Sequence, residues 1–297
     1  MRILEYIIPS EFDGITVQSF LRGEKGFSAK LIRGLKNVEN GMCLNGEHIR
    51  SIDPMKAGDV LTVTIPDDPP ESVPEPLDLS AFSPDEYPEV LYEDEDILVV
   101  TKPGTMAVHP SHNHQGDTLA NLVSYHLAAE GKATTFRAVG RLDKGTSGIV
   151  ICALNPYAAD RLQANIDKTY YAIVLGSLSG EGEICAPIFR PDPIKTIRVV
   201  DERGDYARTF WKSLKTGEKY SLLEIHLETG RTHQIRVHFA HCGNPLIGDT
   251  MYGLPHPAIR RHALHCGRAG FNHPVTGERI ELEAPFPGDM KEFINRI

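Results

Sequence analysis

The sequence has few cysteines and no long apolar run, and both absences narrow what the protein can be. Its five cysteines are an odd number without Cys-x-x-Cys spacing, so no disulfide framework is predicted among the 297 residues. The longest apolar runs, such as residues 149–154, fall far short of the ~20 residues that cross a bilayer. The N-terminus lacks the apolar stretch of a signal peptide. We therefore expect a reduced, cytoplasmic protein without a membrane span.

The sequence also lacks the excess of basic residues that is typical of nucleic-acid-binding proteins. Its formal net charge is −9. All of the excess acid lies in residues 67–100, whose net charge is −12, whereas residues 1–66 are neutral and residues 101–297 carry +3. The total charge therefore reflects one short segment, and it does not exclude an RNA partner for the rest of the chain.

Proline is concentrated in the same acidic segment, with seven prolines between residues 66 and 88. Proline blocks both continuous helix and central strand. We predict an acidic, proline-rich linker at residues 67–89, which separates a module at residues 1–66 from a larger domain at residues 90–297. An acidic surface that mimics or repels RNA is the alternative interpretation.

The predicted N-terminal module shows helix signals followed by hairpin signals. Two short helices are predicted at residues 16–22 and 28–35, with Ser28 as the N-cap of the second. An Asn-Gly pair at residues 45–46 and strict alternation up to residue 65 predict short β-strands. Three basic side chains are spaced along the second helix: Lys30, Arg33 and Lys36. They either contact phosphates or form a solvated face.

The larger domain contains more strand signals than helix signals. Strands are predicted at residues 97–101, 149–154, 170–175 and 222–228. Asn155 and Pro156 predict a helix that continues to Ile166, and Thr232 is expected to cap a helix that ends before Gly243. We therefore expect an α+β fold with a mixed, mostly antiparallel sheet.

A first cluster of reactive residues begins at Arg141 and leads through a glycine-containing turn into the strand at residues 149–154. Asp143 lies in this turn, so the strand that follows is expected to fix its position. An isolated aspartate in a turn commonly hydrogen-bonds its own backbone, here near Thr146. Position alone does not decide between this structural role and a chemical one.

A second cluster, at residues 227–241, runs through a glycine turn into the helix that Thr232 is expected to cap. Arg231 and Arg236 lie near the start of that helix, where positive charge opposes the helix macrodipole. An anion nearby would offset this cost. Three histidines raise the alternative of zinc: His233, His238 and His241. Their spacing does not match a known zinc motif and no acid or cysteine pair completes a set, so no metal is predicted.

Together the two clusters resemble the pseudouridine synthases, in particular the branch that modifies ribosomal RNA and includes large-subunit enzymes with an N-terminal S4-like module. The matching segments are Arg141-Leu142-Asp143, Thr146-Ser147-Gly148, Lys168-Thr169-Tyr170, residues 230–236, Lys102-Pro103-Gly104, Gly248-Asp249, Tyr252-Gly253 and Leu264-His265. Residues 1–66 resemble an S4 RNA-binding domain that ends in a Pro-x-x-x-Gly-Asp hairpin at residues 54–59. The chain departs from this resemblance at Gly140, where the family pattern has histidine before the Arg-Leu-Asp segment.

The resemblance implies a reaction that detaches uracil from ribose at N1, turns it and rejoins it through C5, with no cofactor. It implies that Asp143 either attacks C1′ or removes a C2′ proton, that Arg236 pairs with Asp143, and that Tyr170 stacks on the extruded base. Judged by its own strand alone, Tyr170 would be sheet core, and Arg236 would be a phosphate or surface arginine. Substrate contacts are further expected from Arg141, Lys168, Arg231, His233, Lys30, Arg33 and Lys36.

The expected partner is structured RNA, with large-subunit ribosomal RNA favoured and tRNA open, and the chain is expected to act as a monomer. One rival is an aspartyl phosphotransferase or phosphatase, because the residues after Asp143 resemble a phosphorylation site. Its threonine and glycine stand in the opposite order, and no convincing set of acids for Mg²⁺ follows. The other rival is a non-catalytic RNA-binding protein, which the intact set of Asp143, Tyr170 and Arg236 disfavours.

Overall fold

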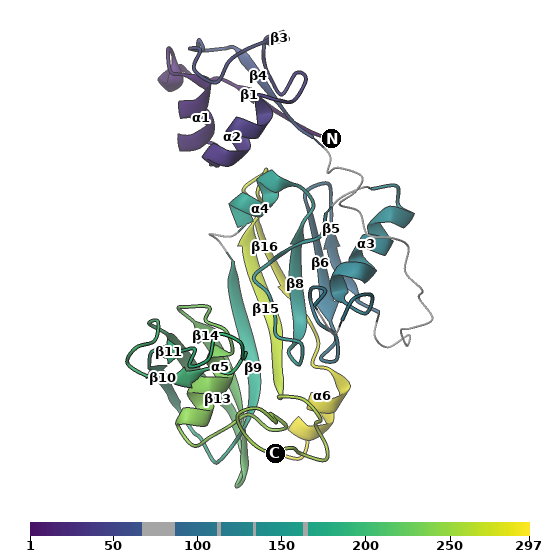
Figure 1. Ribbon diagram of the computed structural model, residues 1–297, viewed down its shortest axis with the longest axis vertical. Helices are drawn as coiled ribbons and strands as arrows, with labels where there is room; N and C mark the ends of the chain where they lie inside the picture. Colours follow the sequence, from purple (N-terminus) through teal and green to yellow (C-terminus); the bar gives the residue numbers. More distant parts are fainter. Residues whose placement is uncertain (67–86, 112–113, 133–134, 163–165) are drawn as a thin grey trace.

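The computed structural model describes residues 1–66, 87–111, 114–132, 135–162 and 166–297, so most of the predicted linker lies outside the described residues. Residues 1–66 form a small lobe at one end of the long axis, and the remaining described residues surround a larger sheet (Figure 1). Within the described part of the chain, no helix has the length and apolar character needed to cross a membrane.

The N-terminal lobe is a four-stranded sheet covered by two helices. Its elements are β1 (Arg2–Ile7), the 3₁₀ turn η1 (Ser10–Phe12), α1 (Val17–Gly23), α2 (Ala29–Leu35), β2 (Met42–Leu44), β3 (Glu47–His48) and β4 (Val60–Ile65). The Ser28 hydroxyl caps α2 as predicted by accepting the Leu31 N–H, and the Thr16 hydroxyl caps α1 in the same way by accepting the Ser19 N–H. The Asn45-Gly46 turn is also confirmed, because both residues adopt the positive φ of a hairpin turn, 52° and 85°.

Strand β1 was not predicted from the sequence, although it pairs with β4 along its whole length. In the sheet order β1-β4-β2-β3, this pairing places the two chain ends of the lobe side by side. The lobe therefore carries β1 in addition to the predicted helices, the strands around the Asn-Gly turn and the alternating strand that ends at residue 65.

The larger sheet has ten strands, and its central path runs β10-β13-β14-β9-β15-β8-β6-β5. These strands are β5 (Val90–Glu93), β6 (Ile97–Lys102), β7 (Arg137–Val139), β8 (Ser147–Ala153), β9 (Asp167–Leu175), β10 (Glu181–Cys185), β13 (Arg208–Thr216), β14 (Tyr220–Leu227), β15 (Leu264–Asn272) and β16 (Arg279–Glu283). β15 and β8 are parallel and the other pairs are antiparallel, so the expected mixed, mostly antiparallel sheet is confirmed.

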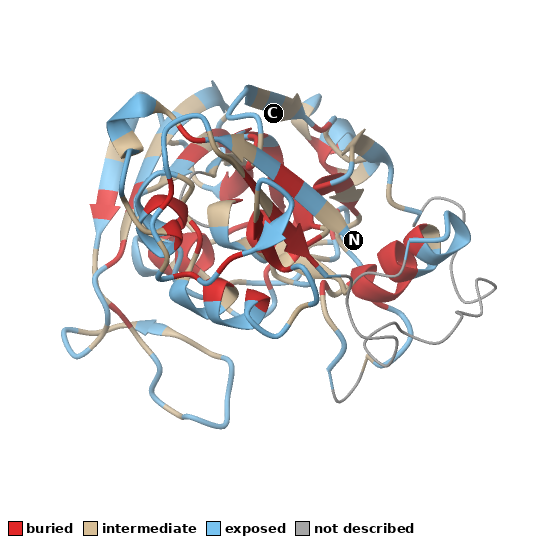
Figure 2. Cartoon of the chain, turned by 90° about the horizontal axis from the view of Figure 1, so that it is seen from above, coloured by how far each residue is buried: buried red, intermediate tan, exposed pale blue. Residues whose placement is uncertain are grey.

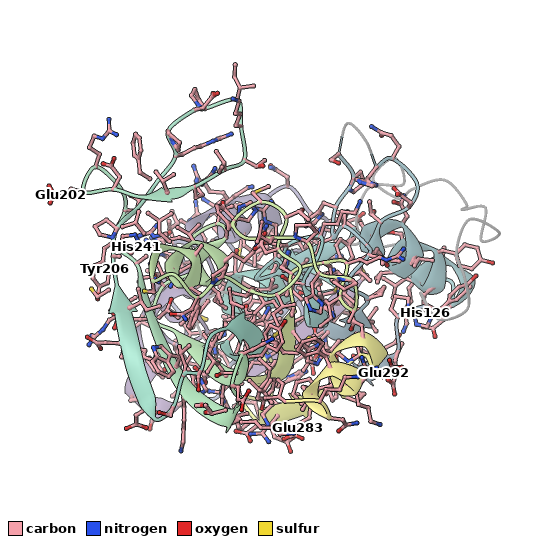
Figure 3. All side chains as sticks on the ribbon, turned by 90° about the horizontal axis from the view of Figure 1, so that it is seen from below. His126, Glu202, Tyr206, His241, Glu283 and Glu292 are labelled. Atoms are coloured by element: carbon pink, nitrogen blue, oxygen red, sulfur yellow. The ribbon has the colours of Figure 1, made fainter. Side chains whose placement is uncertain are left out.

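Helices cover parts of this sheet, and the core lies between them and the central strands. The helices are α3 (Leu119–Ala129), α4 (Pro156–Leu162), α5 (Gln234–His241) and α6 (Gly288–Ile294). All seven residues of β8 are buried, and Figure 2 shows buried residues concentrated in the centre of the body. A short two-stranded ribbon, β11 (Ile188–Phe189) with β12 (Val199–Val200), belongs to a segment that extends from the body near Glu202 (Figure 3). The buried strands thus form a rigid base for the loops at their ends.

Two helix boundaries differ from the predictions. Helix α4 ends at Leu162, and Ile166 lies outside it. Helix α5 is not capped by Thr232, because His233 occupies the N-cap position in a left-handed conformation with φ 59°. The Gln234 side-chain oxygen accepts the Arg231 N–H and thereby holds this turn in place of a threonine cap. The predicted stop at Gly243 is confirmed, with φ 79°.

Candidate active site

Asp143 lies in a tight turn that leads into β8. The Thr146 N–H donates to the Asp143 backbone carbonyl at 3.0 Å, so the main chain itself closes the turn. The Asp143 side chain, 29% exposed, faces away from this turn toward the guanidinium of Arg236. The structure therefore does not support a role for this carboxylate as an Asx-turn acceptor near Thr146.

Arg236, in the first turn of α5, is nearly buried and contacts two carboxylates. Its Nη1 lies 3.3 Å from Asp143 Oδ2, which confirms the expected pairing. Its shorter contacts are to Asp249, with Nε to Oδ2 at 2.7 Å and Nη2 to Oδ1 at 2.9 Å. Burial would lower the pKa of Arg236, but the two carboxylates outweigh burial and raise it. Asp249 thus fixes the guanidinium, and Asp143 receives the remaining, longer contact.

His233 lies beside this pair, with its Nε2 3.8 Å from Asp143 Oδ2. Its Nδ1 is 2.8 Å from the Tyr252 hydroxyl, and that hydroxyl also accepts the backbone N–H of Arg198. Burial lowers the pKa of His233, although the neighbouring Asp143 charge opposes this shift. The imidazole is therefore held neutral near physiological pH beside the carboxylate.

Tyr170 extends from β9 into a cavity that Asp143 also lines. Burial, together with the charge of Asp143, raises the pKa of Tyr170 well above its ordinary value. The phenol therefore stays protonated at physiological pH. Its neighbour Tyr171 points to the other side of the sheet, where its ring packs at 5.1 Å from that of Phe286.

Two cavities meet at the Asp143 carboxylate. The smaller, about 100 Å³, is lined by Arg141, Leu142, Asp143, Thr146, Tyr170, Leu227, Gly230, Arg231, His233, Gln234, Ile235, Arg236 and Leu264. The larger, about 680 Å³, shares Asp143, His233 and Arg236 with it and adds cations at Lys144, Arg260 and Arg261. The first cavity combines Tyr170 and aliphatic side chains with arginines, and the second adds further basic side chains. The arrangement therefore suits a base together with the phosphates that flank it.

The remaining predicted substrate contacts divide into three groups. Arg141 and Arg231 line the smaller cavity as expected. Lys168 lines neither cavity, because its ammonium donates to the Gly140 carbonyl at 2.7 Å and supports the loop that carries Asp143. The predicted direct contact of Lys168 with substrate is therefore not supported. The basic residues of α2 are exposed on the N-terminal lobe and lie outside both cavities: Lys30, Arg33 and Lys36.

Gly140 adopts φ +69°, a left-handed conformation that favours glycine. A Cβ at this position would lie 3.1 Å from the Lys168 ammonium. Glycine at position 140 thus allows Lys168 to approach the loop closely. This contact is a local explanation for the glycine that stands where the family pattern has histidine.

A buried lysine lies beneath the same loop, and no role was predicted for it although it belongs to one of the segments that match the family. Lys102, at the end of β6, is 1% exposed. Its ammonium donates to the carbonyls of Pro103, Met106 and Lys144 at 2.8, 2.8 and 2.9 Å, which uses all three of its N–H groups. Burial and the nearby Arg261 lower the pKa of Lys102 to about 7. A lysine that ends an apolar strand is the signal that could have identified it.

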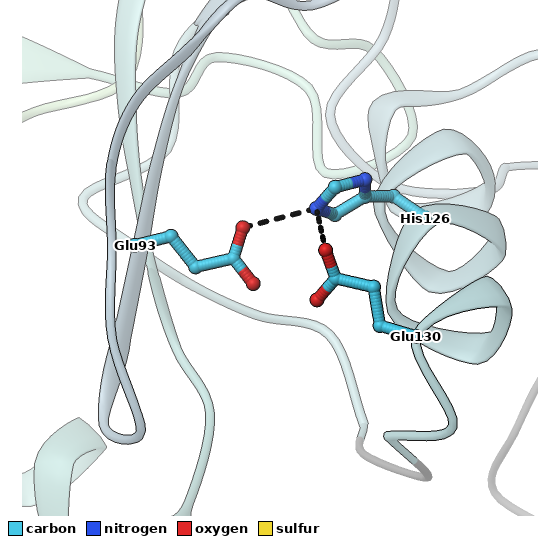
Figure 4. Close-up of side chains that lie close together, drawn as sticks. All are labelled: Glu93, His126 and Glu130. Atoms are coloured by element: carbon cyan, nitrogen blue, oxygen red, sulfur yellow. Dashed lines mark hydrogen bonds and ion pairs between the residues drawn. The ribbon is translucent and has the colours of Figure 1, made fainter.

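Groups of possible metal ligands occur in the described part of the chain only away from the two cavities. Glu93, His126 and Glu130 converge beside α3 (Figure 4), but the Lys132 ammonium already pairs with both glutamates. The second group consists of Asp94, Asp96 and His273, and Arg2 pairs with its buried carboxylate. Side chains of the protein thus already balance charge in both groups.

The histidines considered for zinc do not converge on one point. His238 is buried, with Nδ1 at 2.9 Å from Thr209 Oγ1 and Nε2 at 2.9 Å from the Ala186 carbonyl. His233 instead contacts Tyr252, as described above. Both side chains have structural partners, and neither joins a described ligand group.

Comparison with known proteins places this geometry in a family. The model of the RNA pseudouridylate synthase family matches residues 96–241, which include Asp143, Tyr170 and Arg236. The uncharacterized RNA pseudouridine synthase YhcT of Bacillus subtilis is 36% identical over 98% of this chain and 96% of its own length. The chain belongs to the RNA pseudouridine synthases. Membership in this family disfavours both the phosphotransferase and the non-catalytic alternative.

Two further similarities support the family and its catalytic fold. This pseudouridine synthase is 36% identical to the ribosomal large subunit pseudouridine synthase D of Vibrio cholerae over 68% of each chain. The solved structure of human RNA pseudouridylate synthase domain containing 1 superposes with a TM-score of 0.56 and 25% identity, covering 69% of this chain and 85% of the human one. The α+β catalytic domain expected from the sequence is thus confirmed.

Proposed function

We propose that Asp143 is the catalytic carboxylate of this pseudouridine synthase, and that its substrate is a uridine of large-subunit ribosomal RNA. The observation that carries the proposal is the place of Asp143, which lines both cavities and has a partly exposed carboxylate. A cation beside a carboxylate favours its charged form. Arg236 supplies that cation at 3.3 Å and leaves carboxylate lone pairs free for a substrate.

The reaction breaks the N1–C1′ bond of the uridine and forms a C5–C1′ bond in its place. The ionised Asp143 begins it, either by attacking C1′ or by removing the C2′ proton to give a glycal-like intermediate. The base then turns within the smaller cavity and C5 bonds to C1′, which breaks the Asp143–C1′ bond in the first route and is accompanied by return of the proton to C2′ in the second. The proton then leaves C5, and N1 gains a proton. Mass does not change, and both routes start from the same carboxylate.

Tyr170 is proposed to hold the base and to carry a proton. A uridine in a stacked helix must be extruded before its C1′ becomes accessible, at a cost of a few kcal/mol. Stacking of the base on an aromatic ring offsets about 1–3 kcal/mol of this cost. Because burial keeps the phenol protonated, its hydroxyl can give a proton before it accepts another.

Two observations support ribosomal RNA as the substrate. One relative is named as a ribosomal large subunit enzyme, and that relative shares 68% of its length with this chain. The N-terminal lobe also presents exposed basic residues on α2, which suits a large, folded RNA. A tRNA substrate is the alternative.

Mapping pseudouridines in total RNA from a strain that lacks the gene tests this proposal. We expect the loss of one or a few pseudouridines from large-subunit ribosomal RNA, restored by the wild-type gene and not by a gene that carries Asp143→Asn. Loss from tRNA alone would favour the alternative substrate. An unchanged pseudouridine map of both RNA classes would contradict the proposed activity.

A further inference from the structure

We propose that the N-terminal lobe is docked on the catalytic domain as a fixed spacer, and that Arg2, Asp96 and Tyr157 are positioning residues that determine which uridine of a folded RNA reaches Asp143. The inference rests on the proposed function. It differs from a tethered arrangement, in which the acidic linker alone joins two independent parts.

A bidentate ion pair connects the two parts. Asp96 lies in the turn between β5 and β6 and is only 2% exposed. Its Oδ1 and Oδ2 accept the Nε and Nη2 of Arg2, the first residue of β1, each at 3.0 Å. Asn155 also donates to Asp96 Oδ1 at 2.8 Å. A bidentate arginine–carboxylate pair fixes direction as well as distance, so the contact sets the orientation of β1 relative to the larger sheet.

An aromatic contact reinforces the ion pair. Tyr157, on α4 of the catalytic domain, is 3% exposed and belongs to the hydrophobic core of the N-terminal lobe. Its ring lies 4.5 Å from that of Phe27, and its hydroxyl donates to the Lys25 carbonyl at 3.2 Å. Undocking would expose this aromatic surface to water, so burial of apolar area favours the docked state. The ion pair then selects one docked orientation.

The backbone of the lobe also approaches the catalytic domain closely. Gly26 has φ +69°, and a Cβ on it would lie 2.3 Å from Arg161 Nη1. A side chain at this position would displace the Arg161 side chain of α4. The sequence at residues 25–27 therefore suits the docked arrangement as well as the fold of the lobe.

Docking fixes the separation between the basic helix α2 and the active site. Asp143 lies in the turn before β8, and Asn155 and Tyr157 follow the end of the same strand. A strand of seven residues is about 23 Å long at ~3.3 Å per residue, and all residues of β8 are buried. The docked lobe and the catalytic loop thus lie at opposite ends of one rigid strand, as Figure 1 shows for the lobe, α4 and β8.

This separation defines the class of substrate that uses the whole enzyme. An RNA must extend over more than ~20 Å of protein to contact α2 while its uridine lies at Asp143. A short hairpin that fills only the two cavities gains nothing from the lobe. A docked lobe therefore selects uridines at a fixed distance from a second contact region of a folded RNA.

The test compares Arg2→Gln with wild type in the full chain, with Arg50→Gln as the matched control. Arg50 also pairs with an aspartate, Asp53, but is exposed within the lobe and does not contact the catalytic domain through that pair. Hydrogen exchange of peptides that cover residues 20–28 and 155–161 reports docking directly. Initial rates of tritium release are measured on 5-tritiated large-subunit ribosomal RNA and on a short hairpin that contains the modified uridine.

For Arg2→Gln we expect faster exchange in both peptides and a KM for the long RNA raised about tenfold, because a preorganised second contact is lost. The kcat should change less than about twofold, and KM for the hairpin should not change, whereas a general folding defect would alter both substrates. Arg50→Gln should match wild type throughout. Asp96→Asn, which keeps the shape of the other partner, should reproduce the effect of Arg2→Gln.

Wild-type exchange and wild-type KM in the Arg2→Gln variant would overturn the inference. Faster exchange with an unchanged KM for the long RNA would overturn its second half, the role in substrate selection. If the wild-type enzyme converts no uridine in ribosomal RNA, the proposed substrate fails instead, and the exchange measurement still decides whether the lobe is docked.

Discussion

Asp249 holds the Arg236 guanidinium with both carboxylate oxygens, at 2.7 and 2.9 Å, whereas the proposed catalytic Asp143 receives a single contact at 3.3 Å. Asp249 itself is 1% exposed and also accepts the backbone N–H groups of Met251 and Tyr252. Burial would raise the pKa of Asp249, but Arg236 outweighs burial and lowers it. The position of the guanidinium is therefore determined mainly by Asp249 and less by the proposed catalytic carboxylate.

The first prediction concerns Asp249→Asn, which keeps the size of the side chain and removes its charge. Arg236 should shift from its position beside Asp143, and misplacement of a catalytic neighbour by about 1 Å costs on the order of 100-fold in rate. We expect kcat to fall by about 10–100-fold in tritium-release assays, with RNA affinity nearly unchanged. Asp53→Asn, which breaks the exposed pair with Arg50, is the control. A wild-type kcat for Asp249→Asn would contradict this role.

The second prediction separates the ring of Tyr170 from its hydroxyl. Tyr170→Phe keeps the stacking surface, so KM should remain near wild type while kcat falls by about 100-fold, the lower end of what a general acid contributes. Tyr170→Leu should also raise KM, because stacking worth about 1–3 kcal/mol is lost. Tyr171→Phe, on the opposite side of the sheet, should leave both constants unchanged. Equal activity of Tyr170→Phe and wild type would exclude the hydroxyl from proton transfer.

The third prediction concerns stability at low pH. His265 is 2% exposed, its Nε2 donates to the Ala284 carbonyl at 3.2 Å, and its Nδ1 lies 3.0 Å from the Ser147 hydroxyl. Burial lowers the pKa of His265 to about 4, from 6.5 in the unfolded chain. Between these values the unfolded state binds more protons than the folded state, so this histidine makes stability fall as pH falls from 6.5 toward 4.

The expected loss from His265 is ~3 kcal/mol of unfolding free energy across this range. Urea unfolding at a series of pH values measures it. His265→Gln should flatten the slope, whereas His226→Gln, at a side chain that is 54% exposed, should leave it unchanged. An identical slope in His265→Gln and wild type would show that other groups control acid sensitivity.

The fourth prediction concerns the basic residues of α2. If Lys30 contacts a phosphate, Lys30→Gln should reduce the slope of log affinity against log salt by about 0.7–0.9. The choice of uridine should not change, because phosphate contacts carry no sequence information. Binding to ribosomal RNA is measured at several salt concentrations, with Glu39→Gln as an exposed control on the same lobe. An unchanged slope would mean that this helix faces solvent in the complex.

Local signals in the sequence were sufficient for much of the fold. The cap at Ser28, the Asn45-Gly46 turn and the stop at Gly243 each depend on a few neighbouring residues, and the structure confirms them. Strand β1 was missed because its partner β4 lies at the other end of the lobe sequence, so no short-range pattern marks the pairing.

The candidate site could be predicted only in part, for a similar reason. The contact of Arg236 with Asp143 was expected from a family resemblance. The bidentate contact of Asp249 with Arg236 was not expected, because it depends on how α5 packs against the loop near residue 249. Lys168 was expected in the site because Lys168-Thr169-Tyr170 matches a segment of the family. Its long side chain instead reaches the Gly140 carbonyl, a contact between distant residues that a short motif cannot show.

The most direct test of the account is Asp143→Asn, assayed for tritium release from 5-tritiated ribosomal RNA in the presence of EDTA. The substitution keeps the shape of the side chain and removes the charge that begins either route. We predict full wild-type activity with EDTA, no detectable release by the variant, and RNA affinity within about twofold of wild type, since most of the affinity comes from phosphate contacts. Turnover by Asp143→Asn near the wild-type rate would contradict the assignment of Asp143 as the catalytic carboxylate.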